Sequence, residues 1–100
     1  MQDWYRLTDY EILAEMGHRI KIFRMSKNMT QQVLAEHAGL NRSTIRDMEN
    51  GKSLNALSLV QVFRALEMLS SLDDFLPRIG PVVALQQAER KRVRLSKRNK

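Results

Sequence analysis

The stretch TQQVLAEHAGLNRSTIRDMENGK, residues 30–52, decides the fold expected for this chain. It contains two short segments with apolar residues at helical spacing, and Gly39 lies between them. Thr30 can cap the first segment, Gly39 can end it in a left-handed conformation, and Asn41 can cap the second. Because only about two residues separate Gly39 from the second segment, the two helices are expected to meet at a steep angle.

Two helices joined in this way form a helix-turn-helix, whose second helix lies in the major groove of DNA. The groove is about 12 Å wide and admits one α-helix with a polar outward face. In the second helix, Ile45 and Met48 are expected to face inward. The outward face is then polar and consists of Arg42, Ser43, Thr44, Arg46 and Asp47. These side chains can recognise bases, since Arg donates to guanine, Asp accepts from cytosine, and Ser or Thr does either.

The chain on both sides of this stretch is also expected to be helical. Thr8 with Glu11 three residues later has the form of a capping box, which predicts a first helix over about residues 9–26. Asn55 can cap a fourth helix, and a short fifth turn follows over residues 72–76. Apolar residues recur along the fourth helix as Leu57, Val60, Phe63, Leu66 and Leu69. No segment alternates with period two, so the expected fold class is all-α with five helices.

These elements predict one DNA-binding domain over residues 9–76. An N-terminal extension, residues 1–8, precedes it, and a linker with a basic tail, expected to be mobile, covers residues 77–100. In the extension, Trp4 and Tyr5 could pack across a dimer interface or against the domain's own first helix. The sequence leaves both arrangements open.

The net charge of +6 is confined to the C-terminal end of the chain. From residue 87 onward there are seven basic side chains and one acidic one, whereas residues 1–86 contain ten of each. The basic residues are Arg90, Lys91, Arg92, Arg94, Lys97, Arg98 and Lys100. This tail could be a solvated end, a clamp on DNA phosphates, or a segment that folds against an acidic protein. A membrane role is the weakest alternative, since only Val93 and Leu95 could insert.

Several classes of function are disfavoured by the composition. The chain has no cysteine, which excludes disulfides and thiolate metal sites, and His18 and His37 lack metal-ligand spacing. No apolar stretch approaches the ~20 residues of a membrane span, and no secretory signal follows Met1, so a cytoplasmic location is expected. Because no catalytic cluster is visible, we expect neither an enzyme nor a cofactor.

Residues 30–52 resemble the signature of the XRE/Cro-C1 repressor family, with the core pattern T-Q-x-x-L-A-x-x-A-G-(apolar)-x-R-x-T-I-x-x-(apolar)-E-x-G. The resemblance extends from Met16 to about Phe75. It implies a lambda-repressor-like fold that binds a double-stranded DNA operator as a homodimer, with half-sites about one helical turn, ~10 bp, apart. Repression of transcription is the function that follows.

The resemblance also implies a role for individual residues. Base edges would be read by Arg42, Ser43, Arg46 and Asp47. The DNA backbone would be contacted by Gln31, Gln32, Thr44, Lys52, Ser53 and Asn55. Glu49 would be structural and would hold the backbone or a basic residue of the domain. Asp47 could read a cytosine, or it could pair with Arg42 or Arg46 and orient the guanidinium, and we favour the second interpretation.

The leucine-rich end of the domain has two interpretations. The residues Leu66, Leu69, Leu72, Phe75 and Leu76 could belong to the core, or they could form a dimer interface. We predict the interface, because a chain of this length cannot bury all of them from both sides.

A narrower resemblance is to the HipB-like antitoxins that pair with HipA-type kinase toxins. Residues 63–66, residues 72–77 and Pro81 before the basic tail carry it. It implies a dimer that binds operator DNA and docks a kinase partner. Two rival functions therefore stay open: a protein-interaction module that mainly neutralises a kinase-type toxin, and an RNA-binding protein that uses the tail.

Overall fold

The computed structural model describes residues 2–78 and 88–92, which belong to two compact units, Met1–Leu69 and Ser70–Lys100. All regular structure in these residues is helical, which confirms the expected all-α class. The predicted linker and most of the predicted mobile tail, residues 79–87 and 93–100, lie outside the described residues. The predicted domain over residues 9–76 crosses the division between the units, and its boundaries stay a prediction.

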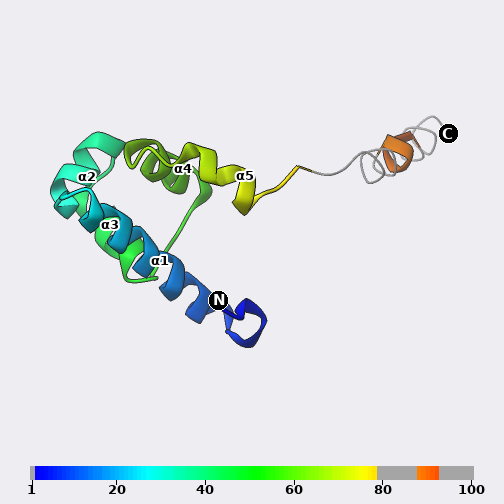
Figure 1. The fold of residues 1–100 in the computed structure, drawn as a ribbon, viewed down its shortest axis with the longest axis horizontal. Coiled ribbons are helices and arrows are strands. Elements are labelled where there is room, and N and C mark those ends of the chain that lie inside the picture. Colours follow the sequence, from blue (N-terminus) through cyan, green and yellow to red (C-terminus); the bar gives the residue numbers. More distant parts are fainter. Residues whose placement is uncertain (1, 79–87, 93–100) are drawn as a thin grey trace. The chain divides into compact units, whose positions relative to one another are not determined.

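The helices follow one another along the chain as Figure 1 shows. The first unit contains the short 3-10 helix η1 (Trp4–Arg6), α1 (Asp9–Ser26), α2 (Gln31–Ala38), α3 (Arg42–Glu49) and α4 (Ala56–Ala65). A second 3-10 turn, η2 (Leu69–Ser71), lies at the division, and α5 (Leu72–Phe75) belongs to the second unit. Among the described helices, none is long and apolar enough to cross a membrane.

The first helix begins where the capping box predicts. The hydroxyl of Thr8 accepts a hydrogen bond from the backbone N–H of Glu11 (3.2 Å), and the Glu11 carboxylate accepts one from the N–H of Thr8 (2.9 Å). These two bonds satisfy backbone donors that an α-helix leaves free at its start. Just before the helix, the Trp4 ring lies 4.7 Å from the guanidinium of Arg19, so Trp4 contacts the domain's own first helix, whereas Tyr5 is fully exposed.

The turn between α2 and α3 has the predicted geometry. The Thr30 hydroxyl accepts from the backbone N–H of Val33 (3.1 Å), which caps α2. At the other end of α2, Gly39 adopts a left-handed conformation with a φ of 69°, and the next N–H donates back to Ala35. Asn41 occupies the N-cap position of α3 but makes no side-chain capping bond. The turn of this helix-turn-helix therefore depends on the glycine more than on a side-chain cap from Asn41.

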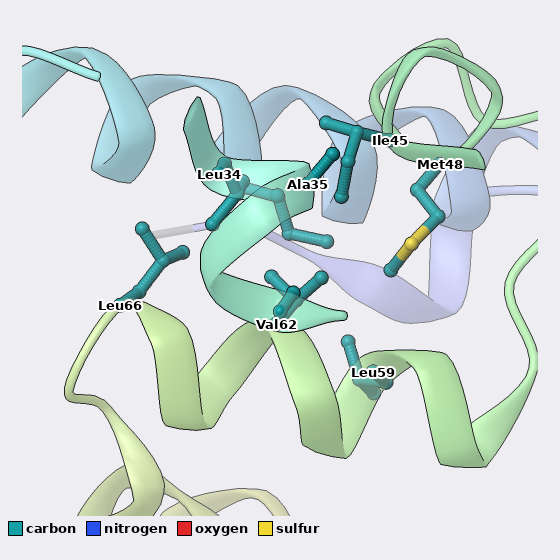
Figure 2. Packing of buried hydrophobic residues seen from close by; sticks show 9 residues of the cluster. Leu34, Ala35, Ile45, Met48, Leu59, Val62 and Leu66 are labelled. Atoms are coloured by element: carbon teal, nitrogen blue, oxygen red, sulfur yellow. The ribbon is translucent and has the colours of Figure 1, made fainter. Parts of the chain in front are cut away.

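The core of the first unit lies where α2 contacts both α3 and α4. Figure 2 shows side chains of α4 and its C-cap facing those of α2 and α3. The buried residues are Ile20, Leu34, Ala35, Ala38, Ile45, Met48, Leu59, Val62 and Leu66. Ile45 and Met48 face inward as predicted, and each such side chain contributes ~1.5–3 kcal/mol by leaving water.

The fourth helix is shorter than the apolar stripe predicted along it, and only part of that stripe is buried. The helix ends at Ala65, because Glu67 adopts a left-handed conformation with a φ of 58°. Its core face carries Leu59 and Val62, whereas Leu57 is 71% exposed. Spacing of three residues falls short of a full helical turn by about 60° at each step, so the predicted stripe winds around the helix.

A glycine allows α1 and α3 to approach closely. A side chain on Gly17 of α1 would collide with the backbone carbonyl oxygens of Met48 and Glu49 at the end of α3. These are backbone atoms and cannot turn away as a flexible side chain can. The position of α3 against α1 therefore requires glycine at residue 17.

Candidate nucleic-acid interface

The outer face of α3 is polar and accessible. Arg42, Ser43 and Arg46 are exposed, and Thr44 and Asp47 are half-buried. The opposite face is held in the core by Ile45 and Met48, of which the first is fully buried. The helix thus presents its predicted base-reading residues on one side and is anchored on the other. The assignment of bases to these side chains stays a prediction.

Asp47 lies near one of the two predicted arginines. Its Oδ1 is 3.9 Å from Nε of Arg46, an electrostatic contact that is too long for a hydrogen bond. Within residues 2–78, no ion pair joins Asp47 to Arg42. Of the two partners considered for Asp47, the geometry therefore favours Arg46.

A buried ion pair connects α1 to the end of α3. The Arg24 guanidinium donates two hydrogen bonds to the Glu49 carboxylate, from Nε to Oε2 (2.7 Å) and from Nη2 to Oε1 (3.0 Å). A third bond from Nη1 reaches the carbonyl oxygen of Met29 (2.8 Å), in the loop before α2. The expected structural role of Glu49 is confirmed, and its partner is Arg24, which was not among the residues predicted from the sequence. The sequence does contain one sign of such a pair. Glu49 lies on the inward face of α3, and a buried carboxylate requires a partner of opposite charge.

The Glu49 carboxylate also binds Gln31, a residue predicted to contact phosphate. Nε2 of Gln31 donates to Oε1 of Glu49 (3.1 Å), and the Gln31 side chain is half-buried. Gln32 is exposed and donates to Glu36 of the same helix (3.1 Å). The first N–H groups of an α-helix have no partner within the helix, so the start of α2 offers donors to an anion.

An open hollow of about 500 Å³ joins the start of α2 to the start of α3. Its lining residues are Arg24, Met29, Thr30, Gln31, Gln32 and Arg42. Two residues predicted to contact phosphate, Gln31 and Gln32, thus share one depression with Arg42, which is predicted to read a base. Since Glu49 neutralises Arg24, the lining residue with a positive charge and no ion-pair partner within residues 2–78 is Arg42.

The loop before α4 carries the remaining predicted backbone contacts. Lys52 and Ser53 are exposed, as a contact with DNA requires. The Oδ1 atom of Asn55 accepts from the N–H of Ser58 (2.8 Å), so Asn55 caps α4 as predicted. Its amide nitrogen is the group that could donate to a phosphate.

The predicted dimer interface needs one correction. Leu66 has no exposed surface and belongs to the core of the first unit, so it cannot contact a second chain there. In the second unit, Leu72 is half-buried, whereas Phe75 is 50% and Leu76 73% exposed. Leu69, at the end of the first unit, is half-buried. The interface stays a prediction for these four residues.

Comparison with protein families supports the interpretation of α2 and α3. Residues 20–72, more than half of the chain, match the family HTH_3, whose description is helix-turn-helix. The chain belongs to the HTH_3 family. Its HTH_3 domain implies DNA binding, and this DNA-binding family is typically non-enzymatic. The XRE-type resemblance is confirmed, whereas a relationship of this HTH_3 protein to HipB-like antitoxins is not shown. No curated protein matches the chain.

Proposed function

We propose that this protein is a transcriptional repressor that binds a pseudo-palindromic operator as a homodimer. The observation that carries the proposal is the polar outer face of α3, with Arg42 and Arg46 exposed above a buried Ile45. An α-helix of this kind fits the major groove, where an arginine can donate two hydrogen bonds to guanine.

The anchoring of α3 supports specific recognition. Its inward side chains are fixed in the core, and its last residue, Glu49, is tied to α1 through Arg24. A rigid helix loses little conformational freedom on binding, so more of the interaction energy remains for discriminating bases. The start of α2, with Gln31 and Gln32, would fix the register of the domain on the phosphates.

The exposed apolar residues of the second unit support the dimer. Phe75 and Leu76 expose surface that a single chain normally buries. A symmetric dimer would use the same patch on both copies and would place two α3 helices in successive major grooves, about one helical turn apart. Bound across a promoter, such a dimer would exclude polymerase.

Selection of DNA by the full chain tests this proposal. The protein is incubated with a pool of random duplexes, and the bound fraction is sequenced over successive rounds. We expect an inverted repeat with half-sites ~10 bp apart and a complex of two chains per duplex, measured by light scattering. Enrichment of no sequence would refute the proposed function, and a single half-site bound by one chain would refute the dimer.

A second candidate function is neutralisation of a kinase-type toxin. It is favoured by the exposure of Phe75 and Leu76, within the stretch that carries the antitoxin resemblance. Its test begins with the adjacent reading frame, which would encode a kinase-like protein. That protein, co-expressed with the full chain, should bind it and lose kinase activity, and the Leu76→Asp variant should bind more weakly. Absence of binding would exclude this role.

A further inference from the structure

Two neighbouring glutamines at the start of α2 are held by carboxylates in different surroundings. Nε2 of Gln31 donates to Oε1 of Glu49 (3.1 Å), whose side chain is 2% exposed. Nε2 of the next residue, Gln32, donates to Oε1 of Glu36 (3.1 Å), and both of these residues are exposed. Water competes for an exposed hydrogen bond, whereas a buried one is electrostatically stronger. The Gln31 side chain is therefore held more firmly than that of Gln32.

The Glu49 carboxylate determines which atom of the Gln31 amide faces it. Its two oxygens accept from Nε and Nη2 of Arg24 (2.7 and 3.0 Å), and Oε1 also accepts from Gln31. An ionised carboxylate only accepts hydrogen bonds, so it takes the amide nitrogen and excludes the amide oxygen. Arg24 is held in turn through Nη1 by the carbonyl oxygen of Met29 (2.8 Å). The Gln31 amide is thus oriented by a carboxylate that is itself fixed.

One donor of the Gln31 amide is left for a ligand. The amide nitrogen carries two N–H groups, and Glu49 uses one of them. Within residues 2–78, the Gln31 side chain makes no other hydrogen bond. Gln31 is half-buried and lines the open hollow that it shares with Gln32 and Arg42. The hollow gives a phosphate oxygen access to this residue, and the second N–H is the donor that remains.

We propose that Glu49 is a positioning residue for DNA, which fixes the Gln31 amide so that its second N–H donates to a phosphate of the operator backbone. Glu49 is buried and acts through Gln31. The proposal rests on the proposed function, because it assigns this role within the same complex with DNA. Immobilising a free side chain on binding lowers the affinity by about two- to tenfold, and a side chain that is already fixed avoids this loss.

The test is a double-mutant cycle between Gln31→Ala and Glu49→Gln in the full chain. Glu49→Gln keeps the size of the side chain but replaces one acceptor oxygen with a donor, so Arg24 and Gln31 compete for the oxygen that is left. Affinity is measured by fluorescence anisotropy at several salt concentrations, for the duplex selected from the random pool and for an unrelated duplex of equal length. Circular dichroism at the same temperature checks that each variant is folded. The matched control is the cycle between Gln32→Ala and Glu49→Gln.

We expect Gln31→Ala to weaken the binding of both duplexes by about tenfold or more, because a hydrogen bond to a charged phosphate is lost. The slope of log affinity against log salt should not change, since glutamine neutralises no phosphate.

The coupling between the two residues carries the test. The factor by which Glu49→Gln weakens binding should be about two- to tenfold larger in the native background than in the Gln31→Ala background. The change of charge at residue 49 acts in both backgrounds and cancels in the cycle. In the control cycle with Gln32→Ala, the effect of Glu49→Gln should be the same in both backgrounds.

NMR of the isotopically labelled native chain covers the case in which Glu49→Gln does not fold. The side-chain amide protons of Gln31 should exchange with water more slowly than those of Gln32. When the selected duplex is added, one of the two N–H signals of Gln31 should shift, while the one bonded to Glu49 should stay in place. Equal exchange rates for the two glutamines, or Gln31 signals that the duplex does not shift, would overturn the proposal.

The outcomes of the cycle separate the positioning role from the proposed function. If Glu49→Gln weakens binding equally in the native and Gln31→Ala backgrounds, Glu49 only stabilises the domain and the positioning role is wrong. Coupling of equal size to Gln32 would also refute it. If the native chain prefers no duplex sequence, the proposed function fails, and the coupling measured on the unrelated duplex then decides the positioning role by itself, because phosphate contacts are independent of sequence.

Discussion

Arg24 of α1 and Glu49 of α3 are 25 residues apart in the sequence and form a buried, two-pronged ion pair. The same Glu49 carboxylate accepts a hydrogen bond from Gln31, the first residue of α2. One buried charge therefore fixes the helix predicted to read bases, the helix predicted to contact phosphate, and the helix that supports both.

Removal of either member of this pair should be strongly destabilising. We expect Arg24→Ala and Glu49→Ala each to lower the free energy of unfolding by about 3–5 kcal/mol, because the remaining charge stays buried without a partner. Urea denaturation followed by circular dichroism measures the loss. The control is Glu15→Ala, which breaks the more exposed Arg19–Glu15 pair (2.9 Å) and should cost ~1 kcal/mol or less. Equal losses of unfolding free energy for the two pairs would show that burial does not determine how much an ion pair stabilises this protein.

Gly17→Ala should destabilise the protein, although alanine favours helix formation. In an exposed helix this replacement stabilises by ~1 kcal/mol, but here the new methyl group would push α1 away from the carbonyl oxygens of α3. We expect a net loss of about 1–3 kcal/mol, the usual cost of overpacking, measured by thermal unfolding. The comparison is Gly39→Ala, whose methyl group would meet no atom closer than 3.9 Å. That variant should lose only the ~1 kcal/mol that a left-handed backbone costs. A stable Gly17→Ala variant would contradict the close approach.

The sequence predicts features that depend on residues close together in the chain, and it predicts less well the features that depend on tertiary packing. The capping of α1 by Thr8 and the turn at Gly39 depend on residues a few positions apart, and both were predictable. The end of α4 was not, because Glu is a good helix former and Glu67 nevertheless adopts a left-handed conformation. Propensity alone extends this helix too far.

The candidate site divides in the same way. The outward residues of α3 were predictable, since helical spacing within eight residues assigns Ile45 and Met48 to the core. The partner of Glu49 was not, because several basic residues lie near the end of α1 and the choice of Arg24 depends on how α1 and α3 pack. The burial of Leu66 likewise depends on the exact rotation of the chain at the end of α4.

Leu66 and Leu76 should respond differently to substitution. Leu66→Ala removes a fully buried side chain and should lower the free energy of unfolding by about 2–5 kcal/mol. Leu76→Asp changes an exposed residue, so the fold should persist while the proposed dimer dissociates. Thermal unfolding and sedimentation velocity measure the two effects. If the Leu76→Asp variant dimerises at the same protein concentration as the native chain, Leu76 does not belong to the interface.

The capping box should make α1 sensitive to acid. The Thr8 backbone N–H donates to the Glu11 carboxylate, and this bond, followed by the nearby Thr8 hydroxyl, lowers the pKa of the Glu11 carboxyl below its usual 4.5. A lowered pKa in the folded state means that the carboxylate stabilises the fold above the usual pKa. This stabilisation is lost as the pH falls through the lowered value. Glu11→Gln should therefore be less stable than the native chain at neutral pH and equally stable in acid. A difference that does not change with pH would contradict this role.

Asp47 should act on DNA through Arg46. If the carboxylate orients the guanidinium, Arg46→Ala and Asp47→Ala should each broaden the base preference at the same position of the operator. The double variant should lose less affinity than the sum of the two single losses, with a coupling of about 0.5–3 kcal/mol. The measurement is a double-mutant cycle on the selected duplex and on its single-base variants.

Arg42 provides the matched control for this cycle. Arg42→Ala should cost ~1–3 kcal/mol on the selected duplex and relax one base position. Because Asp47 pairs with Arg46 and not with Arg42 within residues 2–78, the losses from Arg42→Ala and Asp47→Ala should add within ~0.5 kcal/mol. If Asp47 instead couples to neither arginine and its removal relaxes a separate cytosine position, it reads that base directly.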